Sequence, residues 1–289
     1  MKPEGLIESI RQRLLNLSRE NGEVFDFVLA RYGVERFLHR LSLSAHAGEF
    51  VLKGSMLFHV WNRRMHRPTR DLDLLGAGPA NVESVREAIL DVLRTDAPDD
   101  GLVFEEATLV VAPIREDTTD GGVRAKFRAK LGNVRIPVQV DVGFGDAVVP
   151  APEMREFTSL LSDLPGTSMP SYPVCTVIAE KFEALIRLDE QNTLMKDFFD
   201  LELLLRTDPP ERELLWNAIR ATFERRGSEI PTGIPNGLTD RFASEKQVMW
   251  NAFLRKNGLE VVGFPEVVAA IRGKLAWIWE DRSNGFRKG

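Results

Sequence analysis

The strictest pattern in this chain is an alternation of apolar and basic residues from Val123 to Leu131, followed by a second alternating run from Val134 to Val142. Alternation with a period of two predicts two half-buried strands. Gly132 and Asn133 separate the runs, and glycine at the first position of a two-residue turn favours a type II′ hairpin. The sequence therefore predicts an antiparallel hairpin with one apolar face and one basic face.

The position of the turn predicts which residues face each other across this hairpin. With the turn at residues 132–133, Asp141 lies opposite Arg124, and Gln139 lies opposite Lys126. Asp141 is then a single acid among the cations of the basic face. Those cations are Arg124, Lys126, Arg128 and Lys130.

The rest of the chain divides into a mixed part and a helical part. Before the hairpin, helical spacing alternates with short strand patterns, and residues 24–41 have the spacing of a helix packed on one face. The helical patterns there are 6–17, 24–41, 56–63 and 82–93, and the strand patterns are 50–53 and 71–75. After the proline-rich stretch 165–173 the patterns are helical: 174–188, 195–206, 211–225, 241–256 and 266–279. We expect an α/β domain over residues 1–170 and a helical domain over residues 171–289.

Composition limits the classes of protein that this chain can be. Its 289 residues are 43% apolar, which excludes a disulfide-stapled miniprotein and a disordered tail. Cys175 is the single cysteine, so an internal disulfide and a cysteine-based zinc site are also excluded. The net charge of −5 means that contact with nucleic acid needs a local basic patch. Since the sequence has no secretory-signal pattern and no apolar run of membrane-spanning length, we expect a cytoplasmic protein. A monomer is a separate expectation.

Gly54 and Ser55 stand where a predicted strand ends and a predicted helix begins. Glycine lets a ligand approach the backbone closely, and free amides at a helix start favour a phosphate group together with a serine hydroxyl. The alternative is an ordinary capped helix start. The pair is a candidate phosphate site.

Three carboxylates are candidates for a metal site. Asp71 and Asp73 point to the same side of a predicted strand, where they repel each other unless a cation lies between them. Mg²⁺ binds a few carboxylate oxygens together with substrate phosphates, which suits this pair. With Asp141, acids from two strands could hold two ions that activate an attacking oxygen and stabilise a leaving pyrophosphate. The alternatives are a solvated strand edge for the first two acids and an ion pair with Arg124 for Asp141.

These features together resemble the nucleotidyltransferase superfamily: a Gly-Ser turn, an Asp-Leu-Asp run after an Arg-x-Thr-x lead-in, and a later aspartate on a strand. The helical part makes the resemblance more specific. Residues 176–184 and 195–201, which read TVIAEKFEA and MKDFFDL, are similar to the AbiEii/AbiGii group. That group comprises toxins of abortive-infection and toxin–antitoxin modules, including mycobacterial enzymes that modify tRNA. The resemblance covers roughly residues 50–205.

The resemblance implies an α+β fold, in which a small mixed sheet with flanking helices is followed by a helical domain that completes the active site. It also implies roles for individual residues. Gly54 and Ser55 would hold the nucleotide phosphates, and Asp71 and Asp73 would bind Mg²⁺, with Mn²⁺ as an alternative. The NTP would be the substrate.

The same resemblance implies that Lys181 reaches the triphosphate or the attacking hydroxyl, and that Asp197 completes the site from the next helix. Without the family pattern, Lys181 is a surface lysine between acidic neighbours, and Asp197 is an acid that favours the dipole of its helix. The chain departs from the pattern in one place, because the fifteen residues between Ser55 and Asp71 exceed the family's usual spacing.

The function implied by the resemblance is that of a toxin that transfers a nucleoside monophosphate from an NTP to an RNA acceptor, such as a tRNA 3′ end, and so blocks translation. A cognate antitoxin is the expected protein partner. The alternatives are transfer to a protein or small-molecule hydroxyl, and a nucleotide- or RNA-binding module without catalysis. Basic residues from two segments are expected to contact the RNA backbone. They are Arg64, Arg67, Arg70, Arg124, Lys126, Arg128 and Lys130.

Overall fold

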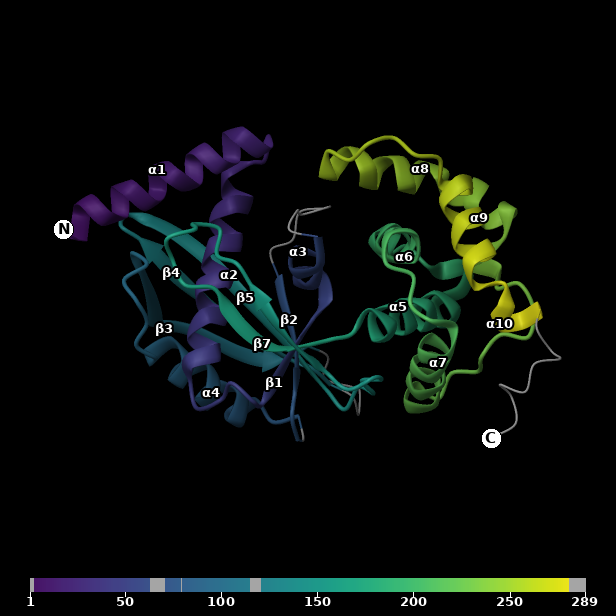
Figure 1. Cartoon of the computed structure of the whole chain (residues 1–289), viewed down its shortest axis with the longest axis horizontal. Coiled ribbons are helices and arrows are strands. Elements are labelled where there is room, and N and C mark those ends of the chain that lie inside the picture. The colour runs from purple at the N-terminus through teal and green to yellow at the C-terminus, as the bar shows by residue number, and fades with distance from the viewer. Residues whose placement is uncertain (1–2, 63–70, 79, 115–120, 281–289) are drawn as a thin grey trace. The chain divides into compact units, whose positions relative to one another are not determined.

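The computed structural model describes residues 3–62, 71–78, 80–114 and 121–280 (Figure 1). The chain divides into two compact units. The first unit comprises Met1–Asp146 and Pro152–Tyr172, and the second comprises Ala147–Ala151 and Pro173–Gly289. Strands are found in the described part of the first unit, and the second is helical.

The first unit is built on a seven-stranded sheet in the order β3-β4-β5-β2-β1-β7-β6. Its strands are β1 (Phe50–Lys53), β2 (Asp71–Gly76), β3 (Leu102–Pro113), β4 (Val123–Leu131), β5 (Val134–Phe144), β6 (Glu153–Phe157) and β7 (Thr167–Ser171). Neighbouring strands are antiparallel, except that β2 pairs with β5 and β1 pairs with β7 in parallel. The sheet is mixed, as predicted.

Strands β4 and β5 form the predicted hairpin. Gly132 has a φ of +59°, the sign that a type II′ turn requires at its first central position. Arg124 lies opposite Asp141 and Lys126 opposite Gln139, so the predicted register is confirmed. The apolar residues of β4 are buried, and its basic residues line the opposite face.

The helices of the first unit are α1 (Pro3–Asn21), α2 (Phe25–Leu43), α3 (Leu57–Asn62) and α4 (Val82–Arg94), and a 3-10 turn at Gly54–Met56 leads into α3. Helix α2 packs on the apolar face of the hairpin. There the ring of Phe37 meets the rings of Phe104 on β3 and Phe127 on β4, with centroids 6.3 and 5.3 Å away.

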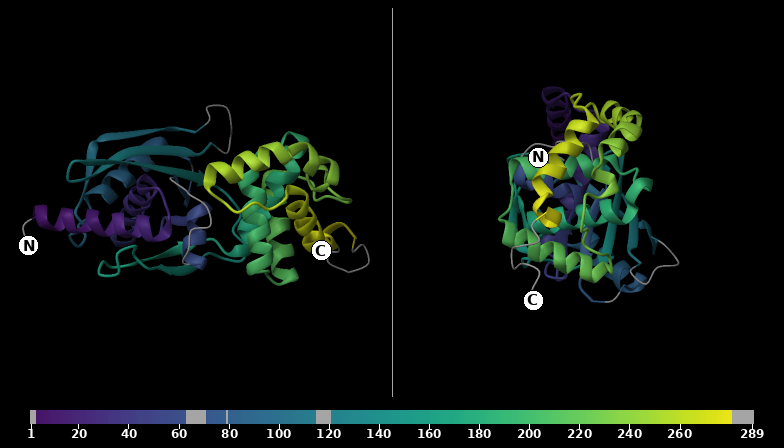
Figure 2. Two further views of the ribbon diagram at one scale, coloured as in Figure 1. Left: turned by 90° about the horizontal axis from the view of Figure 1, so that it is seen from above. Right: turned by 90° about the vertical axis from the view of Figure 1, so that its right-hand side faces the viewer.

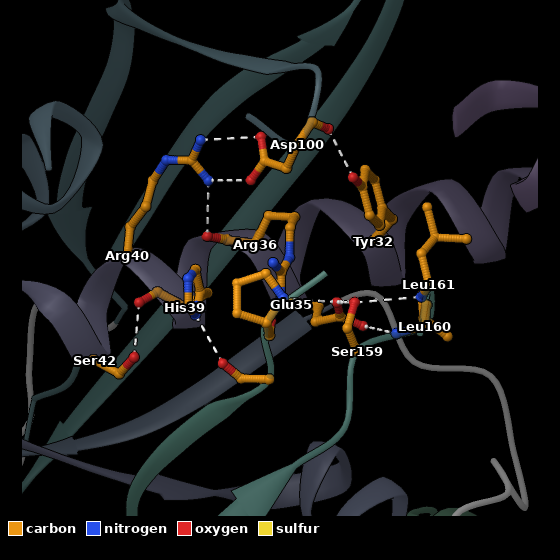
Figure 3. Close-up of polar contacts among 12 residues, drawn as sticks. Tyr32, Glu35, Arg36, His39, Arg40, Ser42, Asp100, Ser159, Leu160 and Leu161 are labelled. Carbon is orange, nitrogen blue, oxygen red and sulfur yellow. Dashed lines mark hydrogen bonds and ion pairs between the residues drawn. The ribbon is translucent and has the colours of Figure 1, made fainter. Parts of the chain in front are cut away.

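Helix α2 is buried on all sides from Val28 to Leu41, and not on one face as the spacing predicts. The reason is that α1, α4, β5 and β7 all contact it, and its polar residues find partners inside the protein (Figure 3). Arg40 donates two hydrogen bonds to the carboxylate of Asp100, at 2.6 and 3.1 Å. The carboxylate of Glu35 accepts hydrogen bonds from Ser159 Oγ at 2.6 Å and from the backbone N–H of Leu160 at 2.8 Å.

The second unit consists of helices (Figures 1 and 2), and these helices pack around aromatic side chains. The ring of Trp250 stacks on Phe264 with centroids 4.9 Å apart, and Phe264 also contacts Phe198 and Phe242. The predicted helix over residues 266–279 is divided at Ala276. The helices are α5 (Val174–Leu188), α6 (Met195–Thr207), α7 (Arg212–Arg226), α8 (Asp240–Asn257), α9 (Phe264–Leu275) and α10 (Trp277–Glu280).

Strands β3, β6 and β7 are not apparent in the sequence pattern, for three different reasons. A register shift between Glu105 and Val110 interrupts the alternation of β3. Strand β6 lies at the edge of the sheet and is mostly exposed, so it lacks an apolar face. Strand β7 contains Pro170, a residue that argues against a strand in sequence.

Candidate active site

Four charged residues from four neighbouring strands form one row across the sheet of the first unit. Lys53 on β1 pairs with Asp73 on β2, Asp73 with Asp141 on β5, and Asp141 with Arg124 on β4. Residues directly opposite each other on adjacent strands share a face of the sheet. This charged row therefore places two adjacent carboxylates between two cations.

The turn at Gly54 lies against the carboxylate of Asp73. Gly54 has a φ of +73°, and a Cβ at this position would lie 2.1 Å from Oδ2 of Asp73. Only glycine permits both that backbone conformation and that approach. Asp71 stands two residues before Asp73 on the same face, at the exposed start of β2. The first unit thus brings the Gly-Ser turn and both acids of the Asp-Leu-Asp run together.

Asp141 forms the ion pair with Arg124 that the sequence offers as an alternative to metal binding. Nε and Nη2 of Arg124 donate to the two oxygens of Asp141, each at 2.7 Å. The hydrogen bond to Asp141 raises the pKa of Arg124 above its ordinary value, and the negative charges of Asp71 and Asp73 contribute to the same shift. The guanidinium therefore stabilises all three carboxylates.

Lys53, at the other end of the charged row, is held by two residues that the sequence reasoning missed. Its Nζ lies 2.6 Å from Oδ2 of Asp146, which also accepts a hydrogen bond from Tyr172 Oη at 3.4 Å. Lys53 stands in the sequence at the end of an apolar run and directly before Gly54 and Ser55. No short segment of the sequence indicates the contact with Asp146, since it depends on the pairing of distant strands.

The basic face of β4 is only partly available for a ligand. Arg124 binds Asp141, and Arg128 and Lys130 both pair with Glu105, at 3.4 and 2.5 Å. The hydrogen bond from Lys130 lowers the pKa of Glu105 below its ordinary value.

A groove of about 870 Å³ opens beside this face in the first unit. Lys126, Arg128, Arg135 and Gln139 line it together with apolar side chains of β5, and Asp71 lies in its wall. The side chains of Lys126 and Arg135 form no ion pair with another residue of the described chain. The groove thus combines apolar surface and cations next to the first acid of β2.

The second unit contains the remaining candidates. Nζ of Lys181 on α5 lies 2.7 Å from Oδ1 of Asp197 and 2.9 Å from Oδ2 of Asp200, both on α6. The side chains of Lys181 and Asp197 are each 15% exposed, so Lys181 is not a surface lysine, and the side chain of Asp200 is fully buried. Asp200 was missed as a site residue, although its spacing from Asp197 places both on one face of a helix.

The predicted site residues fall into two groups. Lys181 and Asp197 lie in the second unit. The first unit contains the remaining described candidates: Gly54, Ser55, Asp71, Asp73, Asp141, Arg124, Lys126, Arg128 and Lys130. Arg64, Arg67 and Arg70, which were predicted to bind RNA, lie outside the described residues. Within the described ranges, no group of three or more His, Cys, Asp or Glu side chains has the geometry to hold a metal ion by itself.

A family model identifies the class of protein. The model described as "Nucleotidyl transferase AbiEii toxin, Type IV TA system" matches residues 36–270. The chain belongs to this family. This AbiEii-family protein is therefore a nucleotidyltransferase toxin of the type IV toxin–antitoxin class, with an NTP as substrate and an antitoxin as partner. The match confirms the resemblance seen in the sequence and extends beyond the segment that carries it.

A solved structure agrees with the fold of this AbiEii-family protein. The crystal structure of JHP933 from Helicobacter pylori is similar with a TM-score of 0.52 and 14% sequence identity, over 88% of this chain and 92% of that one. A second H. pylori structure, described as a presumed nucleotidyltransferase, has a TM-score of 0.49 and 13% identity, over 87% and 94% of the two chains. No curated protein sequence matches. None of the described helices is long and apolar enough to cross a membrane.

Proposed function

We propose that this nucleotidyltransferase moves a nucleoside monophosphate from an NTP to the 3′ end of an RNA, with tRNA as the acceptor and Mg²⁺ as the cofactor. The charged row carries the proposal, because Asp73 and Asp141 lie side by side next to the turn at Gly54. In this reaction the bond from the acceptor oxygen to the α-phosphorus forms as the bond to the bridging oxygen breaks. Pyrophosphate leaves with the electron pair, and the hydroxyl proton passes to water.

The acids of the first unit suit a cation that is shared with substrate. Mg²⁺ is usually bound by one or two carboxylates plus substrate phosphates, and it rarely occupies an all-protein cage. Asp71 and Asp73 offer two carboxylates on one face of β2. A site that is completed by phosphates agrees with the absence of a three-ligand cluster among the described residues. When bound, the ion would stabilise negative charge on the reacting phosphates.

The other residues of the site would position these groups. Arg124 holds Asp141 by two hydrogen bonds and so fixes the carboxylate next to Asp73. If Asp141 also binds the metal ion, one of its oxygens would give up its hydrogen bond from Arg124 and bind the ion instead. We propose that Lys181 binds the triphosphate or the attacking hydroxyl, as the family resemblance implies. Its ammonium is already oriented by two carboxylates, Asp197 and Asp200.

The groove beside β4 supports RNA as the acceptor. A nucleic-acid strand needs cations for its phosphates and apolar surface for its bases. Lys126 and Arg135 supply the cations, and Val134 and Pro137 supply apolar surface in the same groove. Asp71 in the wall of the groove would bring the end of the strand to the acids.

An incorporation assay tests the proposal. The purified chain is incubated with Mg²⁺ and each α-³²P-labelled NTP in turn, together with total tRNA, a mixture of proteins or a mixture of small alcohols. Label on tRNA supports the proposal and shows which base is used. Label on a protein or small molecule alone would keep the transfer and contradict the RNA acceptor. Transfer to no acceptor would contradict this assignment of donor and acceptor.

Salt dependence provides a second readout for the acceptor. Binding of RNA to the groove should weaken steeply as salt rises, because each phosphate contact releases counterions. Lys126→Gln should weaken tRNA binding and reduce the slope by about one. The matched control is Lys274→Gln, a change of an exposed lysine on α9. Equal salt slopes in both variants would contradict a role for the groove.

A further inference from the structure

Lys53 occupies a site that is built around its ammonium group. Nζ lies 2.6 Å from Oδ2 of Asp146 and 5.8 Å from the ring centroid of Tyr172. The side chains of Lys53 and Asp146 are 17% and 19% exposed, so both charges are largely shielded without being sealed off. Nζ also lies above Gly143, where a Cβ would come within 3.0 Å of it.

The surroundings of Lys53 point to an anionic ligand. Lys53 is the residue directly before Gly54, and it is the partner of Asp73 across β1 and β2. Lys53 therefore stands beside the acids that would hold the metal ion, and the metal ion would bind the α-phosphate. A triphosphate bound there carries its β- and γ-phosphates away from the reacting phosphorus, and these groups need further positive charge. A lysine ammonium is a compact cation with three donors and is well suited to phosphate.

We propose that Lys53 binds the pyrophosphate part of the NTP and that Asp146 is the positioning residue that holds its ammonium in place. The proposal rests on the proposed function, since it assigns a ligand to the same site. Lys53 donates to Asp146 and, when substrate binds, also to a phosphate oxygen. As the bond between the α-phosphorus and the bridging oxygen breaks, the ammonium stabilises the negative charge that develops on the leaving pyrophosphate.

Tyr172 gives Asp146 its orientation. Tyr172 is 1% exposed, and its hydroxyl donates to the same oxygen, Oδ2, that binds Lys53. An aspartate held by a buried tyrosine has little freedom to follow the lysine toward solvent. Asp146 therefore keeps the ammonium above Gly143, in the charged row.

Calorimetric titration of the full chain tests this role separately from transfer. Inorganic pyrophosphate, an NTP and the corresponding NMP are titrated in the presence of MgCl₂ into the wild type, Lys53→Met, Lys53→Arg and Asp146→Asn. Lys53→Met should weaken binding of pyrophosphate and NTP by about tenfold to a hundredfold, the range for a charge-assisted hydrogen bond. It should leave NMP binding unchanged. Lys53→Arg should restore part of the affinity, and Asp146→Asn should have a smaller effect than Lys53→Met.

The matched control is Lys274→Met, which removes an exposed lysine on α9 and should bind pyrophosphate as the wild type does. Thermal unfolding shows which variants are folded, and if Lys53→Met is not, Lys53→Arg and Asp146→Asn carry the test. Pyrophosphate binding that is equal in the wild type and the folded variants would overturn the proposal. So would a wild type that binds neither NTP nor pyrophosphate. A wild type that binds both but labels no RNA would contradict the acceptor alone and leave Lys53 in its role.

Discussion

The first unit contains two groups of charged side chains that differ in how deeply the protein buries them. Arg40 on α2 and Asp100, which lies just before β3, form a bidentate pair whose side chains are 9% and 1% exposed. In the charged row, Asp73 has another carboxylate, Asp141, as its neighbour on β5, and the side chain of Arg124 is 37% exposed. The pair of Arg40 and Asp100 is closed to solvent, and the protein itself satisfies both charges. The charged row is more exposed, and its two adjacent carboxylates beside a glycine turn suit a ligand that brings a further cation.

The pKa values of Glu35 and Arg124 are both raised, but for different reasons. Burial raises the pKa of Glu35 above its ordinary value, although Arg36 and the hydrogen bond from Ser159 oppose the shift. The carboxylate of Glu35 is shielded from water, and its hydrogen-bond partners are residues of the protein. Arg124 owes its raised pKa first to the hydrogen bond with Asp141. Substitutions in the charged row should therefore lower activity and leave stability nearly unchanged. Substitutions in the buried pair of Arg40 and Asp100 should lower stability and leave activity unchanged.

The largest effect on activity is expected for Asp73→Asn. Removing this charge should lower nucleotidyl transfer by about a hundredfold to a thousandfold, because the amide is a poor ligand for a divalent cation. The free energy of unfolding should change by less than about 0.5 kcal/mol, since the substitution also removes repulsion from Asp141. Pyrophosphate release and urea unfolding measure the two quantities. Asp208→Asn, at an exposed position, is the matched control and should change neither.

The opposite result is expected for Asp100→Asn. The substitution leaves Arg40 buried without its carboxylate and should cost about 3–5 kcal/mol in the free energy of unfolding. Transfer per folded molecule should stay at the wild-type value. Urea unfolding and an activity assay on the folded fraction check both statements. If Asp100→Asn does not fold, the double substitution Arg40→Met with Asp100→Leu removes both charges and should recover much of the stability. A double variant that folds but has lost transfer would contradict the separation of the two groups.

A smaller loss of activity is expected for Gly54→Ala. The added Cβ would lie 2.1 Å from Oδ2 of Asp73, and the φ of +73° disfavours alanine. Displacing the carboxylate by roughly 1 Å should lower transfer by about a hundredfold. Gly233→Ala is the control, because a Cβ there meets nothing within 4 Å and its φ is not positive. Equal activity of the two variants would show that the contact between Gly54 and Asp73 is unimportant.

The smallest effect is expected for His39→Gln on α2. Burial lowers the pKa of His39 below the ordinary value of 6.5, and Arg36 adds to the shift. As pH falls below 6.5, the unfolded chain takes up a proton that the folded chain does not, so His39 costs stability in acid. His39→Gln should reduce the loss of unfolding free energy between about pH 7.5 and about pH 5.5.

His46 offers a control of opposite sign for that prediction. Burial lowers its pKa, but hydrogen bonds to Glu49 and Asp91 outweigh burial and raise the pKa above 6.5. The stability that His46 contributes is therefore present below pH 6.5 and is lost as pH rises through the raised pKa. His46→Gln should make the acid loss steeper. If the free energy of unfolding depended on pH in the same way in both variants, the opposite pKa shifts of His39 and His46 would be contradicted.

The elements that could be predicted from the sequence are those in which local pattern and tertiary structure agree. The hairpin of β4 and β5 has a strict alternation and a glycine turn, and these two features determine its register. The late helices bury apolar stripes at helical spacing. Strand β7 could not be predicted, because Pro170 contradicts the local pattern and the strand exists only through its neighbours β1 and β6. The complete burial of α2 has the same cause.

The candidate site shows a similar division. Asp71, Asp73 and Gly54 stand close together in the sequence and carry a pattern that a reader can find. The contact of Lys53 with Asp146 joins residues 93 positions apart, and the contacts of Lys181 with Asp197 and Asp200 join two different helices. Contacts that depend on which strands become neighbours are not encoded in any short segment.

The most direct test of this account compares labelling of tRNA by the wild type, Asp73→Asn and Asp100→Asn at equal concentrations of folded protein, with Mg²⁺ and an α-³²P-labelled NTP. The account predicts label at the tRNA 3′ end from the wild type and from Asp100→Asn, and none above background from Asp73→Asn. Label from Asp73→Asn at the wild-type rate would contradict the claim that the charged row performs the reaction.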